Sequence, residues 1–300
     1  MTSSRDSATD FASVEGFIPV TGGSVWYRIA GTGNRTPLLL LHGGPGVPSH
    51  YLETLTALAD ERPVVFYDQL GCGRSERPTE SALWRLERFV RELQQVRDAL
   101  NLSEVHLLAH SWGTMLAAQY LLESPAGVRS AILAGPVLSA PKHRAGLAVL
   151  RRRLPADVRA ALDTHEAKGT VSDPEYLEAV EYFYARHMLL LPEAPPELKK
   201  ATEQMGAESY AAMWGPGELM MMGNLRDFDV TPLVGRLRLP ILFTAGRADL
   251  TRPEEAEHYQ RLIPGAQLEI FEHSAHLTML EEPQAFVARV RKFLREVELS

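Results

Sequence analysis

Ala109-His110-Ser111-Trp112-Gly113 stands between an apolar run at residues 105–108 and a run of small residues at 114–118. This order predicts a buried strand, a sharp turn that carries a serine, and a helix. Such a turn strains the backbone of its central residue and admits only small side chains two positions to either side. Ala109 and Gly113 meet that demand, so we expect the Ser111 hydroxyl at the carboxyl end of a strand. A pentapeptide of this kind also arises by chance, and its interpretation therefore depends on the rest of the chain.

A glycine-rich loop, His42-Gly43-Gly44-Pro45-Gly46, directly follows the apolar run at residues 37–41. Acyl transfer needs two backbone N–H groups aimed at the oxygen that becomes negative in the tetrahedral intermediate. Glycine suits such a loop because it lets the main chain approach a substrate closely. We expect one donor from Gly44, or alternatively from Gly43, and the other from Trp112, the residue after the serine.

Two later loops supply an acid and a base. Asp249 follows the strand-like residues 240–244, and His276 follows a further strand-like run. A serine nucleophile needs a histidine to take its proton and a carboxylate to orient that histidine. The chain order serine, acid, histidine is the order of hydrolases that carry this turn. His276 is a better candidate than His273 because it lies deeper in its loop, so the sequence predicts the triad Ser111, Asp249 and His276.

Strand-like and helical patterns alternate along most of the chain, which predicts an α/β fold whose mostly parallel sheet is covered on both faces. The predicted strands are residues 24–30, 37–41, 64–67, 105–108, 131–133, 241–244 and 268–271. We expect a disordered tail at residues 1–14, a core formed by residues 15–136 and 233–300, and an all-helical insert at residues 137–232.

These motifs resemble the α/β-hydrolase fold and, within it, the proline iminopeptidase family of serine aminopeptidases. The resemblance extends over nearly the whole chain, and two of its stretches are similar to the branch that contains the tricorn-interacting aminopeptidase. The family pattern matches residues 42–46, 68–75 and 111–113, and the branch pattern matches residues 213–218 and 275–281. The resemblance implies a helical cap over the active site and cleavage, through an acyl-enzyme, of an amide or peptide bond next to a small N-terminal residue.

The resemblance also implies where a substrate is held. It places an amine-binding glutamate at Glu218, with Gly43 and Trp214 as further substrate-binding residues. A carboxylate is the natural partner for the positively charged amino terminus that an aminopeptidase must bind.

Two positions depart from the family pattern. Leu250 stands immediately after the predicted triad aspartate, where this branch usually has a second acidic residue. His110 stands before the serine, where iminopeptidases commonly have glycine and where this sequence looks more like esterases and lipases. Glu281 and Glu282 are candidates to supply the missing carboxylate.

Three functions are therefore considered. The first is the aminopeptidase or amino-acid amidase, and the second is an esterase or lactonase for small apolar acyl compounds, in which Glu218 is incidental. The third is a non-catalytic binding protein of the same fold, against which the complete triad argues. Epoxide and haloalkane hydrolases are excluded because they need an aspartate where Ser111 stands.

The composition is that of a soluble globular protein. The formal charge is −7, which argues against a nucleic-acid partner, and no apolar stretch reaches membrane-spanning length. The single cysteine, Cys72, excludes an intrachain disulfide and fits a cytoplasmic location. Nothing in the sequence indicates a metal or an organic cofactor, so the expected partner is a small-molecule or short-peptide substrate, and the oligomeric state stays open.

Overall fold

The computed structural model describes residues 11–299 and is built around one eight-stranded sheet. The spatial order of the strands is β1-β2-β4-β3-β5-β6-β7-β8. The first hairpin is antiparallel and pairs with β4, and all remaining neighbours are parallel. The strands are β1 (Ser13–Val20), β2 (Gly23–Ala30), β3 (Leu38–Leu41), β4 (Val64–Tyr67), β5 (Val105–His110), β6 (Val128–Ala134), β7 (Ile241–Gly246) and β8 (Gln267–Phe271).

Strands β3 and β4 are apolar at every position because both faces of the sheet are covered. In β3, Leu39 and Leu41 pack into one core cluster, while Leu38 and Leu40 pack into the other, as the two-residue period of a strand requires. The helices over the first face are α1 (Leu86–Ala99), α2 (Trp112–Leu122), α8 (Thr231–Val234) and α9 (Pro253–Leu262). Those over the second are η1 (Ser49–Leu58), α10 (Thr278–Glu281) and α11 (Pro283–Leu299). A short η2 (Ser81–Leu83) precedes α1.

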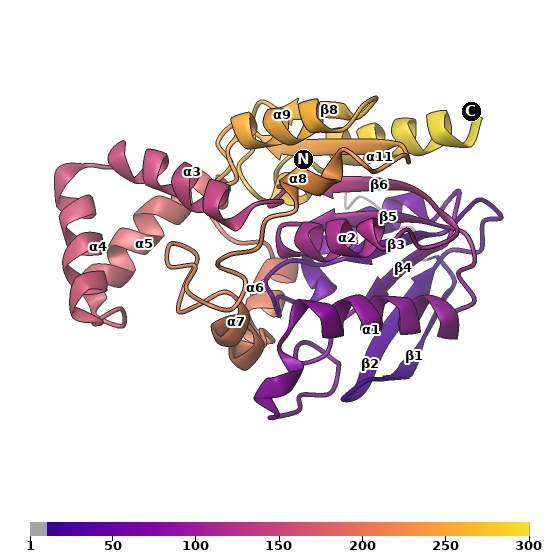
Figure 1. The fold of residues 1–300 in the computed structure, drawn as a ribbon, viewed down its shortest axis with the longest axis horizontal. Coiled ribbons are helices and arrows are strands. Elements are labelled where there is room, and N and C mark those ends of the chain that lie inside the picture. Colours follow the sequence, from indigo (N-terminus) through magenta and orange to yellow (C-terminus); the bar gives the residue numbers. More distant parts are fainter. Residues whose placement is uncertain (1–10, 300) are drawn as a thin grey trace, which may run out of the picture.

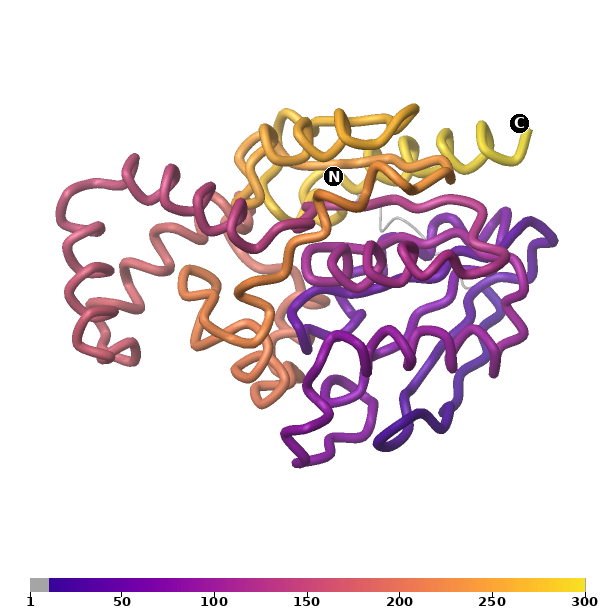
Figure 2. The backbone as a smooth tube through the Cα atoms, viewed as in Figure 1, coloured from indigo at the N-terminus to yellow at the C-terminus, as the bar shows by residue number. Residues whose placement is uncertain are grey.

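The chain between β6 and β7 is helical, and Figure 1 shows α3, α4 and α5 projecting together from the side of the sheet. These helices are α3 (Ala140–Arg152), α4 (Ala156–Lys168), α5 (Pro174–His187), α6 (Pro196–Glu203) and α7 (Ala207–Met213). The segment that leads from the sheet into these helices pairs with the segment that leads back to it. Ala140 N donates to Phe228 O at 2.7 Å, and Val230 N donates to Leu138 O at 3.0 Å. Figure 2 follows this excursion out from the core and back.

The predicted strands are confirmed as β2 to β8, with differences of a few residues at their ends. Strand β1 was not predicted, and it begins at Ser13, so it takes in the last two residues of the predicted tail; residues 1–10 of that tail lie outside the described residues. Its Pro19 is tolerated because β1 lies at the edge of the sheet. Over residues 11–299, no helix combines the length and the apolar character that crossing a membrane requires.

Candidate active site

The sharp turn predicted at Ser111 is present between β5 and α2. Ser111 has φ of +56° and ψ of −123°, a conformation that L-residues adopt only under strain. A side chain at Gly113 would collide with the carbonyl oxygen of Leu41 on the neighbouring strand, so only glycine fits there. The backbone of Ser111 is fixed by a hydrogen bond from its N–H to Ala134 O at 2.9 Å.

Asp249 and His276 meet at the same end of the sheet, from the loops after β7 and β8. The His276 Nδ1–H donates to Asp249 Oδ1 at 2.8 Å, and Thr251 N–H donates to the same oxygen at 2.7 Å. Burial favours the neutral imidazole, but the charge of Asp249 and its hydrogen bond more than offset this effect. The pKa of His276 is therefore raised above its usual value.

A cavity of about 1090 Å³ brings together most of the predicted site residues. Its wall on the core side includes Gly43, Gly44, Ser111 and His276, and its wall on the insert side includes Glu218. Trp214 is fully buried behind this wall, with its ring against His143, and is not among the described residues that line the cavity.

The glycine-rich loop distinguishes the two candidate N–H donors. Gly43 N–H already donates to Tyr51 Oη at 2.7 Å, which favours Gly44 as the donor to a substrate. Gly44 has φ of +114°, in the region that favours glycine, and a side chain there would collide with the backbone of the next turn. Trp112 is the first residue of α2, where a helical N–H has no partner within its own helix.

Tyr51 and His110 form a brace that the sequence did not predict. His110 Nε2–H donates to His276 O at 3.0 Å, so its Nδ1 accepts the Tyr51 hydroxyl at 2.8 Å. Burial, and then the proximity of His276, lowers the pKa of His110 to about 3, which keeps the ring neutral. The chain Gly43–Tyr51–His110–His276 therefore ties the glycine-rich loop to the loop of the predicted base.

A second brace involves Gln69 from the stretch at residues 68–75. Gln69 Oε1 accepts the Trp112 Nε1–H at 2.9 Å, while the Gln69 N–H donates to His42 Nε2 at 2.9 Å. Burial lowers the pKa of His42 to about 4, so this ring is neutral and can accept. Cys72 is buried beside it, and burial raises the pKa of its thiol, which does not favour a thiolate nucleophile.

Glu218 lines the same cavity from the insert, with 8 % of its surface exposed. Its Oε2 accepts the Tyr210 hydroxyl at 3.1 Å. Its Oε1 lacks a hydrogen-bond partner within residues 11–299 and lies 3.7 Å from His143 Nε2.

The positions that depart from the family pattern have structural roles. Leu250 is fully buried and packs with the apolar residues of α3, α4 and α5. Both carboxylate oxygens of Glu281 are occupied, since they accept the N–H groups of Leu190 and Ala275 at 2.5 and 2.8 Å. Glu282 accepts the N–H of His273 at 3.0 Å, and neither glutamate is among the described residues that line the cavity.

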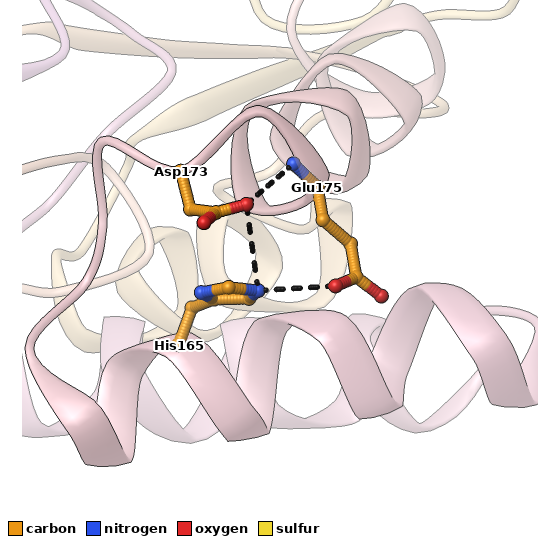
Figure 3. Close-up of side chains that lie close together, drawn as sticks. All are labelled: His165, Asp173 and Glu175. Atoms are coloured by element: carbon orange, nitrogen blue, oxygen red, sulfur yellow. Dashed lines mark hydrogen bonds and ion pairs between the residues drawn. The ribbon is translucent and has the colours of Figure 1, made fainter.

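One group of possible metal ligands occurs in the described part of the chain, in the insert (Figure 3). His165 Nε2 lies 3.2 Å from Glu175 Oε2 and 3.8 Å from Asp173 Oδ1, and Asp173 also caps α5 by accepting the Glu175 N–H. These contacts join α4 to the start of α5, and the two carboxylates are exposed.

Comparison with known proteins agrees with this architecture. Residues 36–283 match the family model described as the alpha/beta hydrolase fold. A proline iminopeptidase of Heyndrickxia coagulans is 44% identical over 286 residues, which cover 94% of this chain and 99% of that protein. The crystal structure of the Mycobacterium smegmatis proline iminopeptidase has 33% identity and a TM-score of 0.89, covering 95% of this chain and 99% of that one.

An esterase of Exiguobacterium antarcticum has 21% identity and a TM-score of 0.69, covering 93% of this chain and 98% of that one, and shares the fold alone. The protein is thus a hydrolase of the α/β-hydrolase fold. Within that class, the chain belongs to the proline iminopeptidase family.

Proposed function

We propose that this protein is a serine aminopeptidase that removes a small N-terminal residue, proline first among the candidates, through an acyl-enzyme. Ser111 attacks the carbonyl carbon of the first residue, and His276 accepts the hydroxyl proton and then delivers it to the leaving amine. Asp249 orients His276 and stabilises its charged form. The N–H groups of Gly44 and Trp112 hold the oxygen that becomes negative, and water then releases the acyl group by the same steps in reverse.

The observation that carries this proposal is a carboxylate in the same cavity as the serine. Glu218 has one oxygen held by Tyr210 and the other without a partner in the described structure, so a substrate ammonium group has an acceptor available. Apolar residues from the insert, such as Met188 and Leu189, also line this cavity and suit a proline ring.

The proposal includes the organisation of the chain. Residues 137–232 form a cap over the core, which comprises residues 15–136 and 233–300. Because the cavity of about 1090 Å³ is lined by residues of both the cap and the core, the substrates are small molecules or short peptides. We further propose a cytoplasmic location, which the single reduced cysteine, Cys72, supports.

The test is a hydrolysis panel of aminoacyl anilides, amino-acid amides, short acyl esters and lactones, run with the wild type and with Glu218→Gln. The variant keeps the shape of the side chain and removes its charge. We expect the wild type to prefer prolyl and other small aminoacyl substrates, and the variant to lose about 2–3 kcal/mol of binding, or roughly 30- to 150-fold in kcat/KM. Neutral esters should be affected much less, because Glu218 acts on them only through its contribution to the raised pKa of His276. A wild type that cleaves esters or lactones faster than aminoacyl anilides, with no selective loss in the variant, would establish the esterase alternative instead.

A further inference from the structure

A buried polar cluster lies directly behind Glu218, outside the predicted triad. His143 on α3 is fully buried, and Glu255 on α9 is 4 % exposed. Both ring nitrogens of His143, both carboxylate oxygens of Glu255 and Oε1 of Glu218 lack hydrogen-bond partners among residues 11–299. Burying so many unpaired polar atoms costs several kcal/mol, which calls for a functional explanation.

The imidazole of His143 lies between the two carboxylates. Its Nε2 is 3.7 Å from Glu218 Oε1, and its Nδ1 is 4.0 Å from Glu255 Oε2. The ring is held by an edge-on contact with Trp214, whose centroid is 5.7 Å away. The order along the cluster is therefore cavity, Glu218, His143 and Glu255.

Helix α3 is built to admit the Glu255 carboxylate. Gly146 lies one turn after His143, and a Cβ there would collide with Glu255 Oε1. Glycine within a helix costs roughly 0.5–1 kcal/mol relative to alanine, so this position gives up stability to make room for a buried carboxylate.

We propose that Glu255 is the second carboxylate of the amine subsite and that it acts on the substrate ammonium group through His143 and Glu218. The inference rests on the proposed function and deepens it, because it supplies the negative charge that Leu250 leaves missing. Glu255 is a positioning residue here, since it lies behind the cavity wall and does not line it.

Protonation of the Glu255 carboxyl controls the charge of the cluster. The protonated carboxyl is neutral and adds no charge to the subsite. When its proton leaves to solvent, Glu255 adds one negative charge, and the ring of His143 lies between that charge and Glu218. Two negative charges hold an ammonium ion more tightly than one, and a buried pair is screened little by salt.

The surroundings of Glu255 bring the loss of its proton close to neutral pH. Burial is the main cause that raises its pKa, to about 7, and Asp249 adds to the rise, while positive charge nearby opposes it. The titratable or charged groups that face it are His143 and Lys142 of α3, Asp249 and Arg252 of the preceding loop, and Tyr259 of α9 itself.

The decisive variant is Glu255→Gln, which mimics the protonated state at every pH. KM and kcat are measured between about pH 5.5 and 8.5 on a prolyl anilide and on a neutral acyl ester. The substrate amine titrates identically for both enzymes, so the ratio of the variant KM to the wild-type KM isolates Glu255. We expect this ratio to be near one at the acid end and to rise to about three- to tenfold at the alkaline end, with kcat and the ester kinetics unchanged.

Two further variants keep the test decisive. Glu255→Met is also neutral but cannot hydrogen-bond, so a shared effect of the two substitutions identifies the lost charge as the cause, even if one of them folds poorly. Glu257→Gln is the matched control, because Glu257 lies on the same helix, its side chain is 43% exposed and it pairs with Arg261, which is not among the groups that face Glu255; its kinetics should match the wild type.

A KM ratio that stays flat with pH, or an equal loss on anilide and ester, would overturn the role of Glu255. If Glu218→Gln loses activity selectively on aminoacyl substrates in the same experiment, the proposed function survives that result. If the wild type does not prefer aminoacyl substrates, the proposed function fails first, and the role of Glu255 fails with it.

Discussion

The core side of the active-site cavity, around Ser111, and its insert side, around Glu218, are built differently. At the Ser111 end, the core side, hydrogen bonds connect the loops, as in the chain from Gly43 through Tyr51 and His110 to the His276 loop, although Asp249 Oδ2 lacks a hydrogen-bond partner among residues 11–299. At the Glu218 end, the insert side, His143 lies within ion-pair distance of two carboxylates, but none of these facing atoms has a hydrogen-bond partner among the described residues.

This contrast reflects two different tasks. Acyl transfer depends on positions, because the serine, the base and the N–H donors must stay aligned within fractions of an ångström. Holding an ammonium ion depends mainly on charge, which acts over several ångströms and can be changed by moving one proton. Substitutions at the Ser111 end should therefore affect all substrates equally, whereas those at the Glu218 end should affect substrates with an amine far more than neutral ones, on which Glu218 acts only through the pKa of His276.

The largest effect is expected for Ser111→Ala. Removing the nucleophile should lower kcat by several orders of magnitude on anilides and esters alike, because the triad residues act as a unit. The circular dichroism spectrum should be unchanged. A serine-directed phosphonate should label the wild type at Ser111 alone; labelling at Cys72, or turnover by the variant, would refute the mechanism.

The base should show nearly as large an effect. His276→Ala should cost orders of magnitude in kcat, while His273→Ala, the matched control three residues away, should cost little. The opposite ranking would identify His273 as the base.

The pH profile of the wild type gives a separate check on His276. Imidazolium cannot accept the serine proton, so kcat/KM falls as the pH drops through the pKa of His276. Because that pKa is raised, the acid limb should lie above the reference value of about 6.5. A neutral ester is the proper substrate for this measurement, since it has no ammonium group for Glu218 or Glu255 to bind. A midpoint below the reference value would contradict the influence of Asp249 on the pKa of His276.

The brace at the Ser111 end should give an intermediate effect. Tyr51→Phe leaves the Gly43 N–H and His110 Nδ1 buried without partners, which should lower the free energy of unfolding by about 1–3 kcal/mol. Because the brace holds two loops of the site, kcat should also fall, roughly tenfold, equally for anilide and ester. Denaturant unfolding and the two kcat values measure this. A loss of stability with an unchanged kcat would show that the brace serves the fold alone.

The sequence predicted what local patterns determine. Continuous apolar runs identified the parallel strands, and the small residues around Ser111 predicted the strained turn that the structure contains. The triad residues could be chosen because parallel strands end at one edge of the sheet, so the loops that follow them converge.

What the sequence did not predict depends on contacts between distant segments. Tyr51 and His110 are 59 residues apart, and no spacing rule relates them. His143 and Glu255 come from helices on opposite sides of the cap-to-core junction, and only the fold brings them behind Glu218. The roles of Leu250 and Gly146 could be interpreted only once their neighbours were known. Gly146 makes room for the Glu255 carboxylate, and Leu250 packs against the helices of the insert.

The smallest effect is expected where the cap touches the loop of the predicted acid. His187, the last residue of α5, donates from Nδ1 to Ala248 O at 2.9 Å, and its own carbonyl accepts the Leu250 N–H at 3.0 Å. These two bonds flank Asp249 on both sides. Burial lowers the pKa of His187, so the neutral ring is the form that makes this contact.

His187→Ala removes the side-chain bond and leaves the backbone bond in place. We expect kcat/KM to fall about two- to fivefold on both substrate classes, in line with the loss of one hydrogen bond of about 0.5–1 kcal/mol. His187→Asn should restore the rate, because its amide nitrogen can donate from nearly the position of Nδ1. His258→Ala, on the outer part of α9, is the matched control and should behave as the wild type. If the asparagine variant is as slow as the alanine variant, the side chain of His187 does not position Asp249. If only aminoacyl substrates are affected, His187 acts on the Glu218 end of the cavity and not on the Ser111 end.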